Sequence, residues 1–198
     1  TVQSTSGISG TADAYAYGVT TPVAAVPRTG SADYAVQLRG VVAYGDGLLA
    51  SRGSGTLSAN FATGGLSGTG GITVYNTSGT PNEPERRWAT AASISATANS
   101  FVGNFGLGRP GNAGVVDQSG SILGKFYGPA AEELGASWLW HDSQLATSFV
   151  GYLLGKKTNL FPSNGALDSL SVNETFQAGA VALNANRDNT NGVLTFNS

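Results

Sequence analysis

Apolar and polar residues alternate along most of this 198-residue chain, and glycines interrupt the alternation at short intervals. The run DYAVQLRG, which starts at Asp33, has an apolar side chain at nearly every second position. Side chains of a strand point alternately to its two faces, so this spacing puts one face on a core and the other in water. The recurring pattern predicts an all-β fold, an antiparallel up-and-down barrel of about eight strands.

One pair of runs predicts a tight hairpin. The run GTLSANF ends at Phe61, LSGTGGITVYN starts at Leu66, and only ATGG separates them. Both runs alternate, and the glycines between them can supply the positive φ angles that short hairpin loops require. We therefore expect two adjacent antiparallel strands here.

Charged residues are scarce, at 11% of the chain, whereas there are 29 glycines. A helical protein would carry more Lys, Glu and Arg on its outer faces, so this composition favours a β-protein with many turns. The net charge is −2 and basic residues cluster only in pairs. We therefore expect no binding to nucleic acid. No apolar run reaches the roughly 18 residues of a membrane helix, and we expect no membrane span.

The chain contains no cysteine and one histidine, which narrows the chemistry that it can perform. The lack of cysteine excludes disulfides, thiolate catalysis and Cys-ligated metal sites. A Ser-His-Asp triad would have to use His141, and no Gly-x-Ser-x-Gly elbow stands between a strand and a helix. Phosphate loops and paired zinc-spaced histidines are absent from the sequence. We expect no enzymatic activity, no catalytic residues and no metal site.

The strand pattern divides the chain into three parts. We expect the barrel in residues 31–157, flanking strands in residues 1–30, and a small β extension or the start of a further domain in residues 158–198. The sequence starts at Thr1 without Met, so we expect a processed or trimmed chain whose lipid anchor, if there is one, would lie upstream.

The segment GPAAEELG interrupts the alternation and looks helical. Pro129 suits the first turn of a helix, and good helix formers follow it. Gly135 suits a helix stop in the left-handed conformation. The segment predicts a short helical insert at Pro129–Leu134 between two late strands, with Leu134 facing the barrel interior.

The run GKFYGPAAEELGASW resembles the G-x-F-(F/Y)-G-P-x-A-x-E-(L/V)-G-G-x-F signature of the transferrin-binding-protein-B-like β-barrel domain. Two positions depart from it, because the second glycine of the pair is Ala136 and the final Phe is Trp138. Three further runs are similar to other segments of that family in the right order, namely VPRTGSADYAVQLRG, GSGTLSANFATGGLSG and FVGYLLGKK. The resemblance covers about residues 15–157.

That family comprises surface lipoproteins and secreted relatives of Gram-negative bacteria, including haemophores. The resemblance implies a location outside the cell or on the outer membrane. It also implies capture of a nutrient, either haem or an iron-bearing host protein, and delivery to an outer-membrane receptor. The transferrin receptors of the family have two lobes with handle domains, whereas this chain has one barrel-like unit, so transferrin binding is not carried over. An alternative function is a structural or adhesive surface barrel without a small-molecule ligand, which the Ser-, Thr- and Asn-rich composition fits equally well.

Four residues are candidates for a haem site. Trp138 and Trp140 would lie on the same face of a strand, and His141 directly follows them. An imidazole can hold haem iron while aromatic side chains line the pocket, and Tyr127 could add an oxygen ligand. In the alternative interpretation, the two tryptophans belong to the core or its rim and His141 begins a turn. The sequence admits haem as a cofactor without requiring one.

The segment Ser78–Thr90 predicts a long exposed loop, because it holds two prolines and a local concentration of charge. Arg86, Arg87 and Trp88 close this segment. An exposed Arg-Arg-Trp tip has the composition of an interaction hot spot, and a solvated loop is the alternative.

Overall fold

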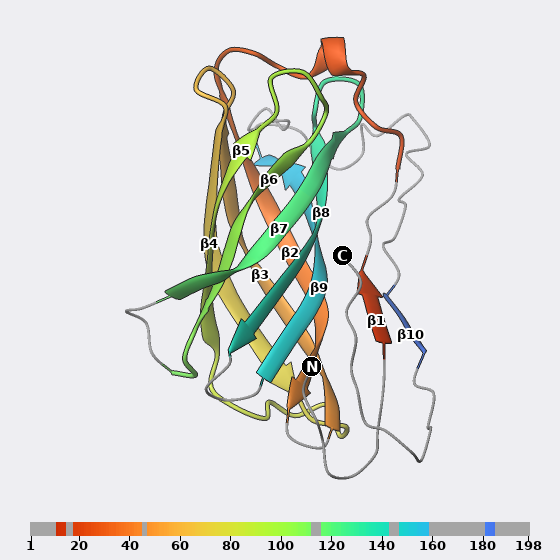
Figure 1. Ribbon diagram of the computed structural model, residues 1–198, viewed down its shortest axis with the longest axis vertical. Coiled ribbons are helices and arrows are strands. Elements are labelled where there is room, and N and C mark those ends of the chain that lie inside the picture. The colour runs from red at the N-terminus through yellow and green to blue at the C-terminus, as the bar shows by residue number, and fades with distance from the viewer. Residues whose placement is uncertain are drawn as a thin grey trace, which may run out of the picture.

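Eight antiparallel strands close into a barrel in the computed structural model, which describes residues 11–14, 18–44, 47–111, 116–142, 147–158 and 181–184 (Figure 1). Each barrel strand pairs with the next one in the chain, and the last pairs with the first. The strands are β2 (Ser31–Tyr44), β3 (Gly47–Asn60), β4 (Gly65–Tyr75), β5 (Arg86–Ile94), β6 (Phe101–Gly108), β7 (Val116–Tyr127), β8 (Glu133–Asp142) and β9 (Thr147–Lys157). This topology confirms the predicted antiparallel up-and-down barrel.

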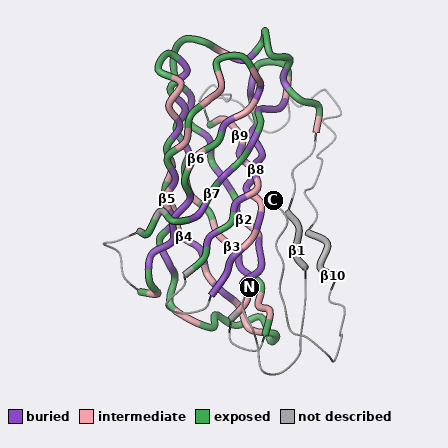
Figure 2. Tube along the Cα trace, in the orientation of Figure 1, coloured by how far each residue is buried: buried purple, intermediate pink, exposed green. Residues whose placement is uncertain are grey.

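Burial alternates along the barrel strands as the sequence predicts (Figure 2). In β2, Tyr34 and Leu38 are fully buried, and the residues next to them are more exposed. The predicted hairpin is formed by β3 and β4. Asn60 Oδ1 closes its turn by accepting hydrogen bonds from the backbone N–H groups of Ala62 and Thr63, both at 3.1 Å.

Three aromatic side chains stack inside the barrel. The ring of Phe105 lies 6.0 Å from that of Trp88 and 4.7 Å from that of Trp138, centroid to centroid, and both pairs are stacked. These large rings fit because glycines of neighbouring strands face them. A Cβ atom on Gly70 would lie 2.6 Å from Trp88 Nε1, and one on Gly151 would lie 2.5 Å from Trp138 Cζ2. Large and small residues thus alternate around the wall, which is how a small barrel fills its interior.

Residues 18–30, here called the strap, cross one end of the barrel, at the top of Figure 1. Val26 of the strap is buried in the core. The side chain of Asn99 fastens the strap to the end of β7. Its Nδ2 donates to Thr21 O at 2.7 Å and to Phe126 O at 2.8 Å, and its Oδ1 accepts from Phe126 N–H at 2.9 Å. The strap therefore closes this end through both apolar burial and a buried hydrogen-bond network.

Two further strands and one short helix complete the described residues. β1 (Thr11–Ala14) pairs with β10 (Val181–Asn184) in an antiparallel two-stranded sheet beside the barrel (Figure 1). The 3-10 helix η1 (Val23–Ala25) lies in the strap. Across the described part of the chain, no helix has the length and apolar character that crossing a membrane requires.

The helical insert predicted at Pro129–Leu134 is wrong. Residues 128–131 form a turn, and Glu133 already begins β8. Ala131 has a φ of 60°, which lies outside the right-handed helical region. A helix this short does not recover the cost of nucleation, whereas β8 pairs with β7 on one side and β9 on the other.

Side-chain hydrogen bonds hold this turn in place of helical ones. Glu132 Oε2 accepts from the Ala130 N–H at 2.8 Å, and the Tyr34 hydroxyl donates to Ala131 O at 2.7 Å. Leu134 faces the interior as expected, but as a residue of β8. The glycine–proline–acid run therefore closes a hairpin, and the turn joins the strap at the same end of the barrel.

Candidate binding surface

Trp138 and Trp140 both point into the barrel, as their spacing predicts. Trp140 Nε1 donates to Asp117 O at 3.0 Å. Its ring meets that of Phe149 edge to face, with the centroids 5.8 Å apart. Both indoles are therefore part of the core, where aromatic packing and a satisfied indole N–H stabilise Trp140.

His141 and Tyr127 lie away from these indoles. His141 is exposed on the opposite face of β8, and its Nδ1 lies 2.8 Å from Ser148 Oγ of β9. Tyr127 lies at the strap end of the barrel, opposite Glu133, and burial raises the pKa of its hydroxyl. Within the described residues, the four haem candidates thus do not line one pocket. Their ligand role stays a prediction, which a hemin titration of the protein and of His141→Ala would test.

The predicted exposed tip at Arg86, Arg87 and Trp88 is wrong for two of its three residues. β5 begins at Arg86, so Arg86 and Trp88 point inward and are 1% and 0% exposed, whereas Arg87 is exposed. The prolines and charges of the segment made the loop look longer than it is. The signal that could have located β5 was the period-two spacing of Arg86, Trp88 and Thr90, all of them buried.

The buried charge of Arg86 is compensated locally. Its Nε and Nη2 contact the two carboxylate oxygens of Glu83 at 2.5 and 2.9 Å. The guanidinium also lies 5.4 Å from the ring centroid of Phe149. A bidentate pair of this kind satisfies a guanidinium that would otherwise be costly to bury. Arg86 therefore anchors the β4–β5 loop to the barrel. Its guanidinium is turned inward and is not presented on the surface to another protein.

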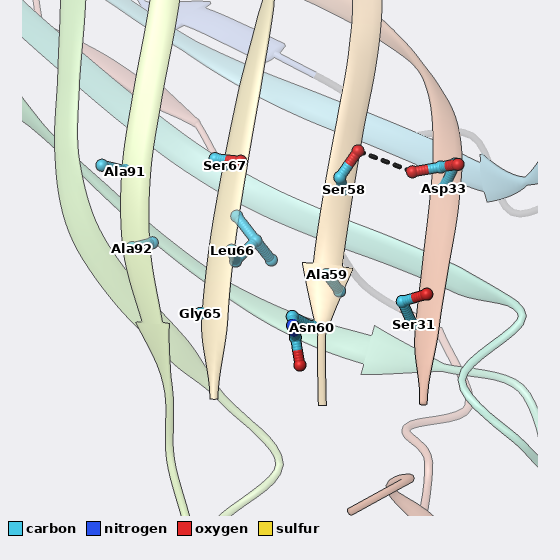
Figure 3. Close-up of a pocket in the computed structure, with 10 residues that line it drawn as sticks. All are labelled: Ser31, Asp33, Ser58, Ala59, Asn60, Gly65, Leu66, Ser67, Ala91 and Ala92. Carbon is cyan, nitrogen blue, oxygen red and sulfur yellow. Dashed lines mark hydrogen bonds between the residues drawn. The ribbon is translucent and has the colours of Figure 1, made fainter. Parts of the chain in front are cut away.

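A shallow hollow of about 580 Å³ lies on the outer wall near the turn between β3 and β4 (Figure 3). Its lining is mostly small side chains of β2 to β5, namely Ser31, Asp33, Ser58, Ala59, Asn60, Gly65, Leu66, Ser67, Ala91 and Ala92. Asp33 Oδ1 accepts a 2.6 Å hydrogen bond from Ser58 Oγ, and the two side chains point toward each other. The hollow has no aromatic wall, so it suits polar contacts with a partner better than enclosure of a small molecule. Among the described residues, no three His, Asp or Glu side chains are grouped so that they could hold a metal ion.

Comparisons with known proteins find the barrel in solved structures. No family model matches the sequence, and neither does any curated protein. A mutant of the vaccine antigen transferrin-binding protein B (TbpB) from Haemophilus parasuis Hp5 matches with a TM-score of 0.51 and 18% identity. A double mutant of that protein matches with a TM-score of 0.50 and 20% identity. Both matches cover 71% of this chain and 28% of the TbpB chain.

At these identities the likeness concerns the fold, and the chain spans only 28% of the length of those TbpB structures. The sequence resemblance in the glycine–proline–acid run and the barrel topology point to the same fold. Strands β2 to β9 of this chain therefore have the fold of a TbpB-like β-barrel domain.

Proposed function

We propose that this chain is a binding protein of the Gram-negative cell surface, anchored or secreted, that captures an iron-bearing host protein. The solved structures with this fold are named for transferrin binding, which supports a protein ligand of that class. An outer-membrane receptor would then receive the captured iron.

The packed interior is the observation that carries this proposal. The stack of Trp88, Phe105 and Trp138 occupies the space that a ligand-enclosing barrel keeps open. A ligand therefore has to contact the outer wall or the connections at the barrel ends, where side chains can differ without disturbing the core. Flat and shallow surfaces of this kind suit a protein better than a small molecule.

Biolayer interferometry on the immobilised chain tests the proposal. We expect saturable binding of iron-loaded transferrin from at least one host species, or of haemoglobin, and no binding of serum albumin. Absence of binding with either iron-bearing protein at about 50 μM would contradict the proposal. The dissociation constant would then exceed that concentration, which is too weak for specific capture. That outcome would favour the structural or adhesive alternative.

A further inference from the structure

Two arginines lie directly opposite each other on the outer wall of the barrel. The register pairs Arg39 of β2 with Arg52 of β3. Their neighbours Leu38 and Ser51 are buried in the interior, so the alternation turns both arginines outward. The Cβ atoms of directly opposite residues are about 5 Å apart. Two positively charged side chains therefore leave the wall from directly opposite positions. They are here called the arginine pair.

Neither guanidinium of the arginine pair has a carboxylate partner among the described residues. Arg39 Nη1 donates to Leu38 O at 2.9 Å, and the guanidinium carbon of Arg52 lies 5.3 Å from the ring centroid of Tyr75. The carboxylate of Glu85 packs over Gly71 of β4 on the same wall, outside ion-pair distance of both arginines. Like charges directly opposite each other weaken a sheet, so the fold keeps a repulsion that its own described residues do not neutralise.

Two tyrosines flank the arginine pair. Tyr152 of β9 is directly opposite Arg39, and Tyr75 of β4 lies beneath Arg52. Both tyrosines are half-buried. Arginine and tyrosine are enriched in the energetic centres of protein interfaces, because both combine apolar contact area with hydrogen-bond donors. Four adjacent outward residues are uncharged, namely Gln37, Ala50, Ser54 and Thr73. The nearest charged groups on this wall are at Gly71, where Glu85 packs and which is paired with the exposed Arg87.

Charges are scarce in this chain, so the arginine pair stands out as a local positive site that can select an acidic ligand. The whole sequence has 10 Lys and Arg residues against 12 Asp and Glu, so the pair does not belong to a generally basic surface. A guanidinium fork binds a carboxylate through two parallel hydrogen bonds. The flanking tyrosines favour carboxylates carried by a protein, since a free phosphate would leave their apolar area uncovered.

We propose that the arginine pair, with Tyr75 and Tyr152, is a docking site for an acidic patch on the surface of a protein partner. The inference rests on the proposed function, because it names the part of the wall that the captured protein would contact. Carboxylates of the partner accept hydrogen bonds from both guanidiniums and remove the repulsion between them. Binding at this site therefore weakens as salt rises.

A hexaglutamate peptide is the probe for this site, used with the full chain in a low-salt calorimetric titration. We expect wild-type protein to bind hexaglutamate and not hexalysine. The double variant Arg39→Gln/Arg52→Gln should bind hexaglutamate about tenfold more weakly or worse. The matched control Arg28→Gln/Lys125→Gln removes two exposed cations elsewhere and should stay within about twofold of wild type. Equal binding by the two double variants overturns the site.

Two comparisons complete the test. Inorganic phosphate that binds the wild-type chain as tightly as hexaglutamate overturns the assignment to protein carboxylates. Transferrin or haemoglobin that binds wild type and Arg39→Gln/Arg52→Gln equally also overturns the docking site, while the proposed function stands. A third outcome is hexaglutamate binding that depends on the pair, without binding of transferrin or haemoglobin. This outcome supports a docking site for an acidic protein and contradicts only the proposed capture of an iron-bearing protein.

Discussion

At the scale of single residues, Asn99 has the donor and acceptor pattern that its position demands. Its amide donates to the carbonyl groups of Thr21 and Phe126 and accepts from the Phe126 N–H. Asn99→Asp keeps the shape but replaces the donor with a second oxygen, which faces two carbonyl oxygens in a buried site. We expect the free energy of unfolding to fall by at least about 3 kcal/mol in urea titrations.

The control for Asn99 is the same chemical change at an exposed site. Asn104→Asp on the outer face of β6 should shift the free energy of unfolding by no more than about 0.5 kcal/mol. Equal losses in the two variants would mean that added negative charge, not the lost donor, is responsible. A released strap should also make Asn99→Asp more sensitive to proteolysis within residues 18–30.

At the scale of elements, Tyr34 ties strand β2 to the turn before β8, and this contact depends on pH. Its hydroxyl donates to Ala131 O, and the pKa of that hydroxyl is raised well above its usual value, mainly by burial and also by the charge of Glu132. The folded state thus keeps a proton that the unfolded chain releases above pH ~10. Stability is therefore constant below that pH and falls above it, by about 1.4 kcal/mol per pH unit for this group.

Unfolding measurements between pH 8 and pH 11 check this dependence. Tyr34→Phe should lose about 1 kcal/mol at neutral pH, because Ala131 O loses its donor, but its stability should fall less steeply in alkali. If stability falls with pH as steeply in Tyr34→Phe as in the wild type, other groups cause the loss of stability in alkali.

The strands and turns also show which parts of the fold can be predicted from the sequence alone. Period-two spacing predicted the barrel because burial of one strand face is a local property of the chain. The turn at residues 128–131 could not be predicted, since its residues favour a helix and only pairing of β8 with β7 and β9 overrides that preference. The inward side chains of Arg86 and Trp88 are hard to predict, because the prolines and charges before them are typical of an exposed loop.

At the scale of the whole molecule, the surface sites follow from register. Arg39 and Arg52 are 13 positions apart in the sequence and meet only because the β2–β3 register places them opposite each other. Nothing in either local sequence signals that meeting, so the arginine pair was not among the predicted site residues. The haem candidates are the opposite case, since residues adjacent in the sequence are separated in the structure. Trp140 and His141 are neighbours in the chain but point to opposite faces of β8.

Closure of the whole barrel depends on inward glycines that make room for its aromatic stack. Gly70→Val would place a side chain against Ser54 O, the nearest atom, and against Trp88 Nε1 and Gly55 Cα, which lie 2.6 and 2.7 Å from the added Cβ. Because neither the paired backbone nor the stacked ring can move freely, we expect a loss of about 3 kcal/mol in the free energy of unfolding. The tryptophan fluorescence should shift to longer wavelength as the stack loosens.

The matched control is Gly47→Val in β3, where an added Cβ would have no atom within 4 Å. That variant should keep its stability within about 0.5 kcal/mol. Combining Gly70→Val with Trp88→Phe should recover at least about 1 kcal/mol of the loss, because the smaller ring withdraws the indole nitrogen from the new side chain. Strictly additive losses in the double variant would show that backbone crowding between β3 and β4, and not the aromatic stack, sets the need for glycine at this position.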